Sequence, residues 1–105
     1  MATLIELLKT LVEMHGSDLH IATDTPPQVR IHGHLTRLDH PALKPSDTKQ
    51  LIYSVLTDLQ KKRFEESWEL DLAFSLSGVS RFRCNVFMQR GAVGAVYREI
   101  GRAHV

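Results

Sequence analysis

Apolar residues that recur every three or four positions predict three helices in this chain. The first is expected over residues 4–14, where four leucines are separated by charged and polar residues, and Gly16 is expected to end it. The second should follow Ser46, which can act as its N-cap. The third is expected to begin soon after it and to run to about residue 67, since Thr57 and Gln60 match a capping box. The apolar stripe of the second helix is Leu51, Ile52, Val55 and Leu56.

Shorter segments in which apolar and polar residues alternate predict six strands. Three of them are expected before the second helix, over residues 18–23, 28–32 and 34–38, and three after the third helix, over residues 69–76, 81–89 and 92–100. The element order is then α-β-β-β-α-α-β-β-β. This order predicts an α+β fold in which a mostly antiparallel sheet of about six strands has its helices packed on one side.

Length and composition indicate a single globular domain. The chain has 105 residues, of which 43% are hydrophobic and 24% charged. One cysteine cannot form an internal disulfide, which fits a reducing compartment, and no apolar run has the length of a membrane helix. The first residues, which include Glu6 and Glu13, do not resemble a signal peptide. We therefore expect a soluble intracellular domain.

The net charge of +1 conceals an uneven distribution of charges along the chain. The stretch from Val79 to Arg102 holds five arginines, a single acid and no lysine. Arginine carries a planar set of donors that suits phosphate or carboxylate groups. An anionic partner is therefore expected at the C-terminal third, although the near-neutral total argues against a strongly basic nucleic-acid binder. The arginines of this stretch are Arg81, Arg83, Arg90, Arg98 and Arg102.

The last two strands predict where these arginines lie. A two-residue turn between them would pair Gln89 with Ala92, and counting back from there places Arg83 opposite Arg98. Arg81 would lie on the same face. Because like charges directly opposite each other destabilise a strand pair, this register predicts an anion, such as a phosphate, bound between them. The alternative is that these arginines are solvated, or paired with Glu69, Asp71 or Glu99.

The chain lacks the motifs of a complete nucleotide or metal site. It has no Gly-x-x-x-x-Gly-Lys-Ser/Thr loop and no Gly-x-Gly-x-x-Gly, so it offers no phosphate cradle of its own. No catalytic residue and no metal ligand is predicted here. His32, His34 and His40 are interpreted as exposed loop residues, because no acid or cysteine joins them at ligand spacing.

Three other side chains that could react or bind a ligand are interpreted as structural. Cys84 alternates with core residues and is interpreted as a small buried hydrophobe. His20 lies between two apolar residues of a predicted strand and is expected to make structural hydrogen bonds. Trp68 stands between the third helix and the next strand and is expected to anchor the core.

Several motifs in order resemble one known family. The resemblance covers about residues 3–100 and is to the N-terminal domain of the PilT-type twitching-motility ATPases, which power type IV pilus retraction and belong to the secretion ATPase superfamily. The motifs are Gly16-Ser-Asp-Leu-His20, Pro26-Pro-Gln-Val-Arg30, Phe64-Glu-Glu66, Ser80-Arg-Phe-Arg-Cys-Asn85, Gln89-Arg-Gly-Ala92 and Tyr97-Arg-Glu-Ile100.

The resemblance implies a PAS-like domain over residues 1–100 of a larger motor. Residues 101–105 are then expected to be a truncated linker or a cloning scar. The RecA-like ATPase domain with the Walker motifs is absent from this chain, so the fragment alone is expected to be no enzyme. The intact protein is expected to be a hexameric ATPase that uses ATP and Mg, with neither expected on the fragment.

The resemblance also implies a location, partners and a role for the arginines. The intact protein is expected in the cytoplasm, at the inner face of the bacterial inner membrane. Its partners would be its own C-terminal domain, neighbouring subunits of a homohexamer and the pilus platform in that membrane, with no nucleic acid. In the superfamily two arginines fifteen residues apart approach the nucleotide phosphates. Arg83 and Arg98 have that spacing, and Arg81 is an additional candidate.

Two other functions stay open on the sequence alone. A PAS-like ligand-sensing or protein-interaction module would contain an interior cavity. A nucleic-acid binder would use the arginine face, but the near-neutral charge and the lack of an aromatic row on that face argue against it.

Overall fold

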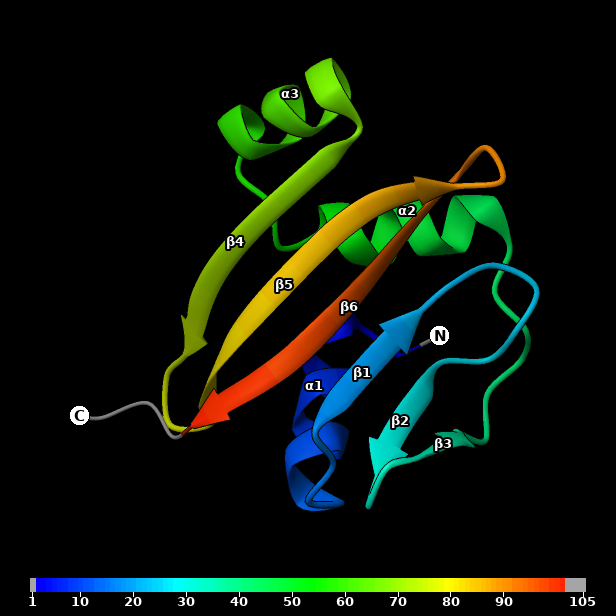
Figure 1. Cartoon of the computed structure of the whole chain (residues 1–105), viewed down its shortest axis with the longest axis vertical. Helices are drawn as coiled ribbons and strands as arrows, with labels where there is room; N and C mark the ends of the chain where they lie inside the picture. Colours follow the sequence, from blue (N-terminus) through cyan, green and yellow to red (C-terminus); the bar gives the residue numbers. More distant parts are fainter. Residues whose placement is uncertain (1, 102–105) are drawn as a thin grey trace.

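The computed structural model describes residues 2–101, and in them six antiparallel strands form one open sheet. The strand order is β3-β2-β1-β6-β5-β4, so the first and last strands of the chain, β1 and β6, meet at the centre of the sheet (Figure 1). The predicted α+β class and the order of elements are confirmed. The elements are α1 (Leu4–Glu13), β1 (Asp18–Ile21), β2 (Gln28–Ile31), β3 (His34–Arg37), α2 (Pro45–Tyr53), α3 (Asp58–Ser67), β4 (Glu69–Leu76), β5 (Ser80–Gln89) and β6 (Ala92–Gly101).

The helices begin at local capping structures, two of which the sequence analysis did not predict. Helix α1 begins at Thr3, whose hydroxyl accepts a hydrogen bond from the Glu6 backbone while the Glu6 carboxylate accepts one from the Thr3 backbone. These bonds lower the pKa of Glu6. Helix α3 has the capping box expected from Thr57 and Gln60.

The predicted start of α2 was wrong by two residues. Its N-cap is Lys44, not Ser46, and Pro45 occupies the first helical position, where its missing N–H costs nothing. The Asp47 carboxylate accepts a hydrogen bond from the Lys44 backbone at 2.9 Å. The helix also ends earlier than its apolar stripe suggested, so Leu56 lies beyond it and is nevertheless buried.

The end of α1 shows why a glycine stands at position 16. The left-handed residue that ends the helix is His15, with φ of 56°, so Gly16 is not needed for its backbone freedom. A Cβ at Gly16 would lie 2.5 Å from Cγ1 of Val29 and 2.7 Å from Cδ1 of Leu11. Gly16 therefore allows the chain to pass closely between α1 and β2.

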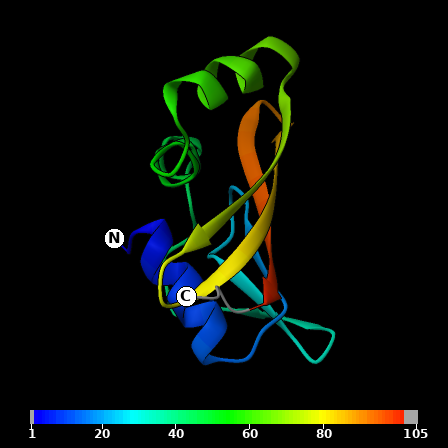
Figure 2. The ribbon, with the colours of Figure 1, turned by 90° about the vertical axis from the view of Figure 1, so that its left-hand side faces the viewer.

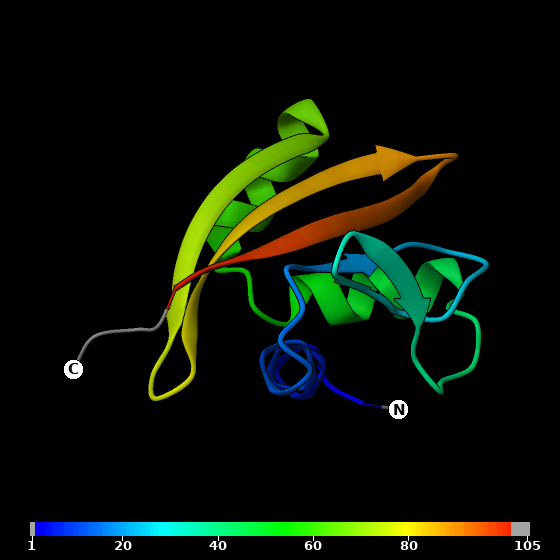
Figure 3. The ribbon, with the colours of Figure 1, turned by 60° about the horizontal axis from the view of Figure 1, so that its bottom comes forward.

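The helices lie on one side of the sheet and leave its other face open (Figures 2 and 3). The apolar faces of the helices and the inward residues of the strands form the core, in which Phe64, Phe82 and Tyr97 are the largest fully buried side chains. Trp68 was predicted as a core anchor, and this was wrong: it is 50% exposed. It ends α3 in the left-handed conformation, with φ of 58°, which turns the chain into β4. No helix within residues 2–101 is long and apolar enough to cross a membrane.

The turn between β5 and β6 has the predicted two residues. Arg90 and Gly91 both have positive φ angles, 54° and 76°, as a tight hairpin turn of the I′ type requires. Gln89 pairs with Ala92, and the register then continues without interruption to the pair of Phe82 with Glu99. The register inferred from the sequence is confirmed over this length.

Residues 102–105, which the sequence analysis assigned to a linker or a cloning scar, lie outside the described residues. Gly101, the first residue of that predicted segment, is the last residue of β6. Its carbonyl oxygen accepts a short hydrogen bond from the Ser80 hydroxyl, which fastens the end of β6 to the start of β5.

Substitutions in the hairpin turn test how much its left-handed backbone contributes to stability. No atom within 4 Å would meet a Cβ at Gly91, so Gly91→Ala is expected to destabilise the chain only through its positive φ, by ~1–2 kcal/mol. Arg90→Asn is the matched control and should keep or raise stability, because asparagine tolerates this conformation. Urea unfolding of both variants measures the effect. Equal stability of Gly91→Ala and the unsubstituted chain would contradict it.

Candidate functional site

The open face of the sheet carries a row of charged residues across four strands. Arg98 on β6 pairs directly with Arg83 on β5 and with Asp18 on β1, and Asp18 in turn pairs with Arg30 on β2. Residues that are directly opposite in neighbouring strands lie on the same face. The order across the sheet is therefore Arg30, Asp18, Arg98 and Arg83, and on β4 the row ends at Ala73.

Asp18 is the centre of this row. Its side chain is only 6% exposed, and both of its oxygens bind arginine. Oδ1 accepts a hydrogen bond of 3.0 Å from Nε of Arg98, and Oδ2 lies 3.3 Å from Nε of Arg30. The Ser17 hydroxyl donates a further bond of 3.3 Å to Oδ2. These partners compensate the buried negative charge and hydrogen-bond both carboxylate oxygens.

The Arg98 guanidinium thus has an acidic partner, which is none of the three acids, Glu69, Asp71 and Glu99, considered from the sequence. Its partner Asp18 lies 80 positions away, and the two meet only because β1 and β6 are neighbours in the sheet. One observation could have suggested this carboxylate. Asp18 is an acidic residue at the start of a predicted strand, on the polar side of its alternation.

Arg83 is the arginine of the pair without an acidic partner. It is exposed, and no carboxylate in the described part of the chain comes within 4.0 Å of its charged nitrogens. A shallow depression of about 220 Å³ lies beside it. Asp71, on the rim, accepts a hydrogen bond of 2.9 Å from the Asn85 side chain and so is engaged away from the arginines. The depression is lined by Asp71, Arg83, Cys84, Asn85, Val96 and Arg98.

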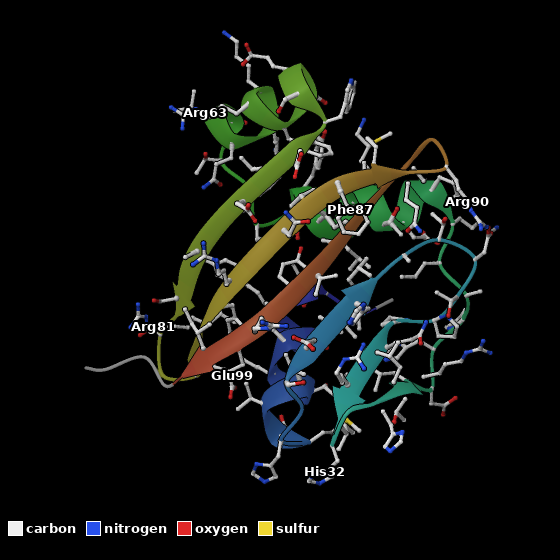
Figure 4. The ribbon with its side chains drawn as sticks, in the orientation of Figure 1. His32, Arg63, Arg81, Phe87, Arg90 and Glu99 are labelled. Atoms are coloured by element: carbon white, nitrogen blue, oxygen red, sulfur yellow. The ribbon has the colours of Figure 1, made fainter. Side chains whose placement is uncertain are left out.

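Arg81 lies farther along the hairpin than simple counting suggests. A β-bulge between Arg81 and Phe82 leaves Ile100 without a partner, so Arg81 pairs with Gly101. Arg81 is exposed near the start of β5, beside the turn that joins β4 and β5 (Figure 4). The structure therefore brings Arg83 and Arg98 together and places Arg81 at the margin of the site.

His20 borders the charged row, because it lies two residues after Asp18 on the same face of β1. It was expected to make structural hydrogen bonds, but Nε2 is buried and has no partner within residues 2–101. Burial is the main cause that lowers the pKa of His20. The Asp18 carboxylate opposes this effect and Arg30 adds to it. The neutral imidazole is therefore favoured in the folded chain.

Cys84 is buried on the opposite side of β5, as expected. Burial raises its pKa to about 12, so the thiol is not a reactive group at neutral pH. Its cross-strand neighbour Tyr97 is fully buried, and its hydroxyl pKa is raised for the same reason. Both residues belong to the core and not to the charged row.

The exposure predicted for the three loop histidines is confirmed for two of them and is wrong for His40. His32 and His34 are exposed, and His40 is half-buried in the loop that leads to α2. The described residues contain no group of three or more His, Cys, Asp or Glu side chains placed to hold a metal ion.

Known proteins match this chain in both sequence and fold. The type IV pilus retraction ATPase PilT of Pseudomonas aeruginosa is 41% identical over 95 residues, which are 90% of this chain and 28% of PilT. The crystal structure of the pilus retraction motor PilT with bound ADP superimposes with a TM-score of 0.86 over 93% of this chain and 29% of that one. This chain is similar in sequence and in fold to the N-terminal domain of PilT. No family model matches this chain.

A second relative agrees with this assignment. The type IV pilus ATPase PilU of the same organism is 36% identical over 90% of this chain, which spans 25% of PilU. The chain thus spans about a quarter of the length of PilT and of PilU.

The burial of His20 predicts a dependence of stability on pH. The folded chain holds the pKa of His20 below its ordinary value of 6.5. Below pH 6.5 the unfolded chain therefore binds a proton at His20 more readily than the folded chain does, so the free energy of unfolding falls as the pH falls below 6.5 and is unaffected by His20 above it. In His20→Gln the loss of stability between pH 7.5 and pH 5 should be smaller. His34→Gln, on the exposed strand β3, is the control and should leave the loss unchanged. Urea unfolding at both pH values measures it, and an unchanged loss in His20→Gln would contradict the prediction.

Proposed function

We propose that this chain is the N-terminal domain of a hexameric motor ATPase that retracts type IV pili. In this proposal the hydrolytic site belongs to a RecA-like domain of the same protein, with ATP and Mg²⁺ as its nucleotide and metal. This chain packs on a neighbouring subunit of the ring and supplies positive charge to the nucleotide phosphates. The ring acts in the cytoplasm, at the inner-membrane platform of the pilus machinery.

The observation that carries the proposal is the Arg83–Arg98 pair. The two residues are directly opposite on neighbouring strands, on the face that α1, α2 and α3 leave uncovered. Two guanidinium groups in this arrangement repel each other unless an anion lies between them. A polyphosphate suits them, because each guanidinium can donate two parallel hydrogen bonds to phosphate oxygens.

The role of the pair is that of a mobile electrostatic clamp. The chain has no P-loop, so the phosphates would be held by the RecA-like domain and approached by the arginines when the ring closes. Charge that arrives only in the closed state stabilises the transition state of phosphoryl transfer more than the bound substrate. Arg81, at the end of the hairpin, is expected to make a smaller contribution.

A PAS-like ligand sensor is the second candidate, and one cavity supports it. A pocket of about 310 Å³ opens between α1, α2 and the loop that precedes α2. Its walls are mainly apolar, with His40 and Asp47 as the ionisable residues. The Arg83–Arg98 pair favours the motor domain, because the pocket lies away from this pair and does not explain it.

Arg83→Ala in the full-length protein tests the clamp. We expect the ATPase rate to fall about 100-fold or more and pilus retraction to stop, since a preorganised charge at the phosphates is lost. Arg63→Ala is the matched control, because Arg63 is an exposed arginine on α3, away from the hairpin (Figure 4). Unchanged ATPase rate and retraction in Arg83→Ala would refute the assignment.

The chain by itself is expected to hydrolyse no ATP and to bind it weakly, because half of the site is supplied by the other domain. A phosphate-release assay and a titration with ATP measure the two properties. The proposal would be overturned if the purified chain hydrolysed ATP and if Arg83→Ala abolished both this hydrolysis and the binding of ATP. The hydrolytic site would then lie in this domain.

A further inference from the structure

We infer that Asp18 is a positioning residue, which holds Arg98 in the orientation that an incoming polyphosphate requires. This inference rests on the proposed function of the Arg83–Arg98 pair. It adds a carboxylate of a different strand to a site otherwise made of arginines. Asp18 would not touch the anion itself and would act only through Arg98.

The contact that Asp18 makes leaves the useful part of Arg98 free. Asp18 accepts its hydrogen bond from Nε, the nitrogen nearest the aliphatic stem. The two terminal nitrogens of the guanidinium make no hydrogen bond within residues 2–101, and the Arg98 side chain is 69% exposed. Those two nitrogens can therefore donate a pair of parallel bonds to a phosphate while Nε stays on the carboxylate.

Asp18 is itself held firmly enough to orient another side chain. It is nearly completely buried, and Arg30 fixes its second oxygen. Arg30 is anchored in turn, since Nη1 donates a hydrogen bond of 3.0 Å to the carbonyl of Gly33 in the β2–β3 turn. A carboxylate fixed in this way limits the rotamers of Arg98 before any anion arrives.

The charges of the row are consistent with positioning and not with neutralisation. Asp18 binds Arg30 and Arg98, and Arg83 has no carboxylate within 4.0 Å in the described residues, so the four residues of the row together carry a net charge of about +2 (three positive, one negative). Asp18 draws Arg98 toward β1, which reduces its repulsion with Arg83 in the absence of an anion. The excess of positive charge remains available on the side of Arg83.

Two carboxylates on the same face allow a test in which charge and position have opposite effects. Asp18→Asn and Asp71→Asn each remove one negative charge near the arginine pair, but only Asp18 contacts an arginine. By charge alone both variants should bind an anion more tightly, and Asp18→Asn by more, because Asp18 is closer to Arg98 and more buried. If Asp18 positions Arg98, the order is reversed.

The probe is inorganic tripolyphosphate, titrated at low ionic strength into the 105-residue chain while the arginine Nε–H resonances are followed by NMR. We expect Asp71→Asn to bind tripolyphosphate about 2- to 12-fold more tightly than Asp18→Asn. In Asp18→Asn the Arg98 side chain is no longer held in place, and the cost of ordering one such side chain on binding corresponds to this factor. A Kd of Asp18→Asn equal to or below that of Asp71→Asn would overturn the inference. No response of Arg83 and Arg98 in any of the proteins would refute the anion site itself, and the inference with it.

A second measurement does not depend on the anion. The Nε–H proton of Arg98 should exchange slowly with water in the unsubstituted chain and in Asp71→Asn, and rapidly in Asp18→Asn. Equal exchange in all three proteins would show that Asp18 does not hold Arg98, whatever the anion does. This result separates a failure of the positioning from a failure of the proposed function.

Arg98→Lys covers the case in which Asp18→Asn does not fold. A lysine keeps the positive charge but has a single charged nitrogen, which Asp18 would engage and withhold from the anion. We therefore expect Arg98→Lys to bind tripolyphosphate more weakly than the unsubstituted chain by a similar factor. Undiminished binding would count against the inference.

Discussion

The pairing of β5 with β6 is the constraint on which the rest of the site depends. The two-residue turn at Arg90 and Gly91 sets the register, and the buried side chains of one face exclude a shift by one residue, since that would turn the core residues toward solvent. Arg83 and Arg98 consequently face each other whether or not their charges favour it. The apolar core stabilises an arrangement that the polar face alone would oppose.

The central position of β1 determines how that opposition is relieved. Because β1 lies between β2 and β6, Asp18 has an arginine on each side, and one buried carboxylate serves both. A buried carboxylate is tolerated only with such partners, so the fold and the charged row depend on each other. Arg83, at the other end of the row, has no equivalent partner within residues 2–101 and is exposed.

The sequence was sufficient where a local rule decides the structure. The hairpin register followed from Arg90-Gly91 and the alternation of core residues, and the start of α3 followed from Thr57 and Gln60. The contact between Asp18 and Arg98 could not be found in this way, because it depends on which strands become neighbours over 80 positions. Trp68 was misplaced for a related reason: an aromatic residue is usually buried, but here the junction between α3 and β4 requires a left-handed residue.

The open face makes the arginine pair accessible to a ligand or to a second protein surface. The helices occupy one side of the sheet, so the charged row can meet a second protein surface along its whole length. An anion held on that surface would complete the row by supplying the negative charge that Arg83 lacks. In the proposed function, no helix within residues 2–101 would have to move to admit such an anion, and the register of a single hairpin would place both arginines to attract it.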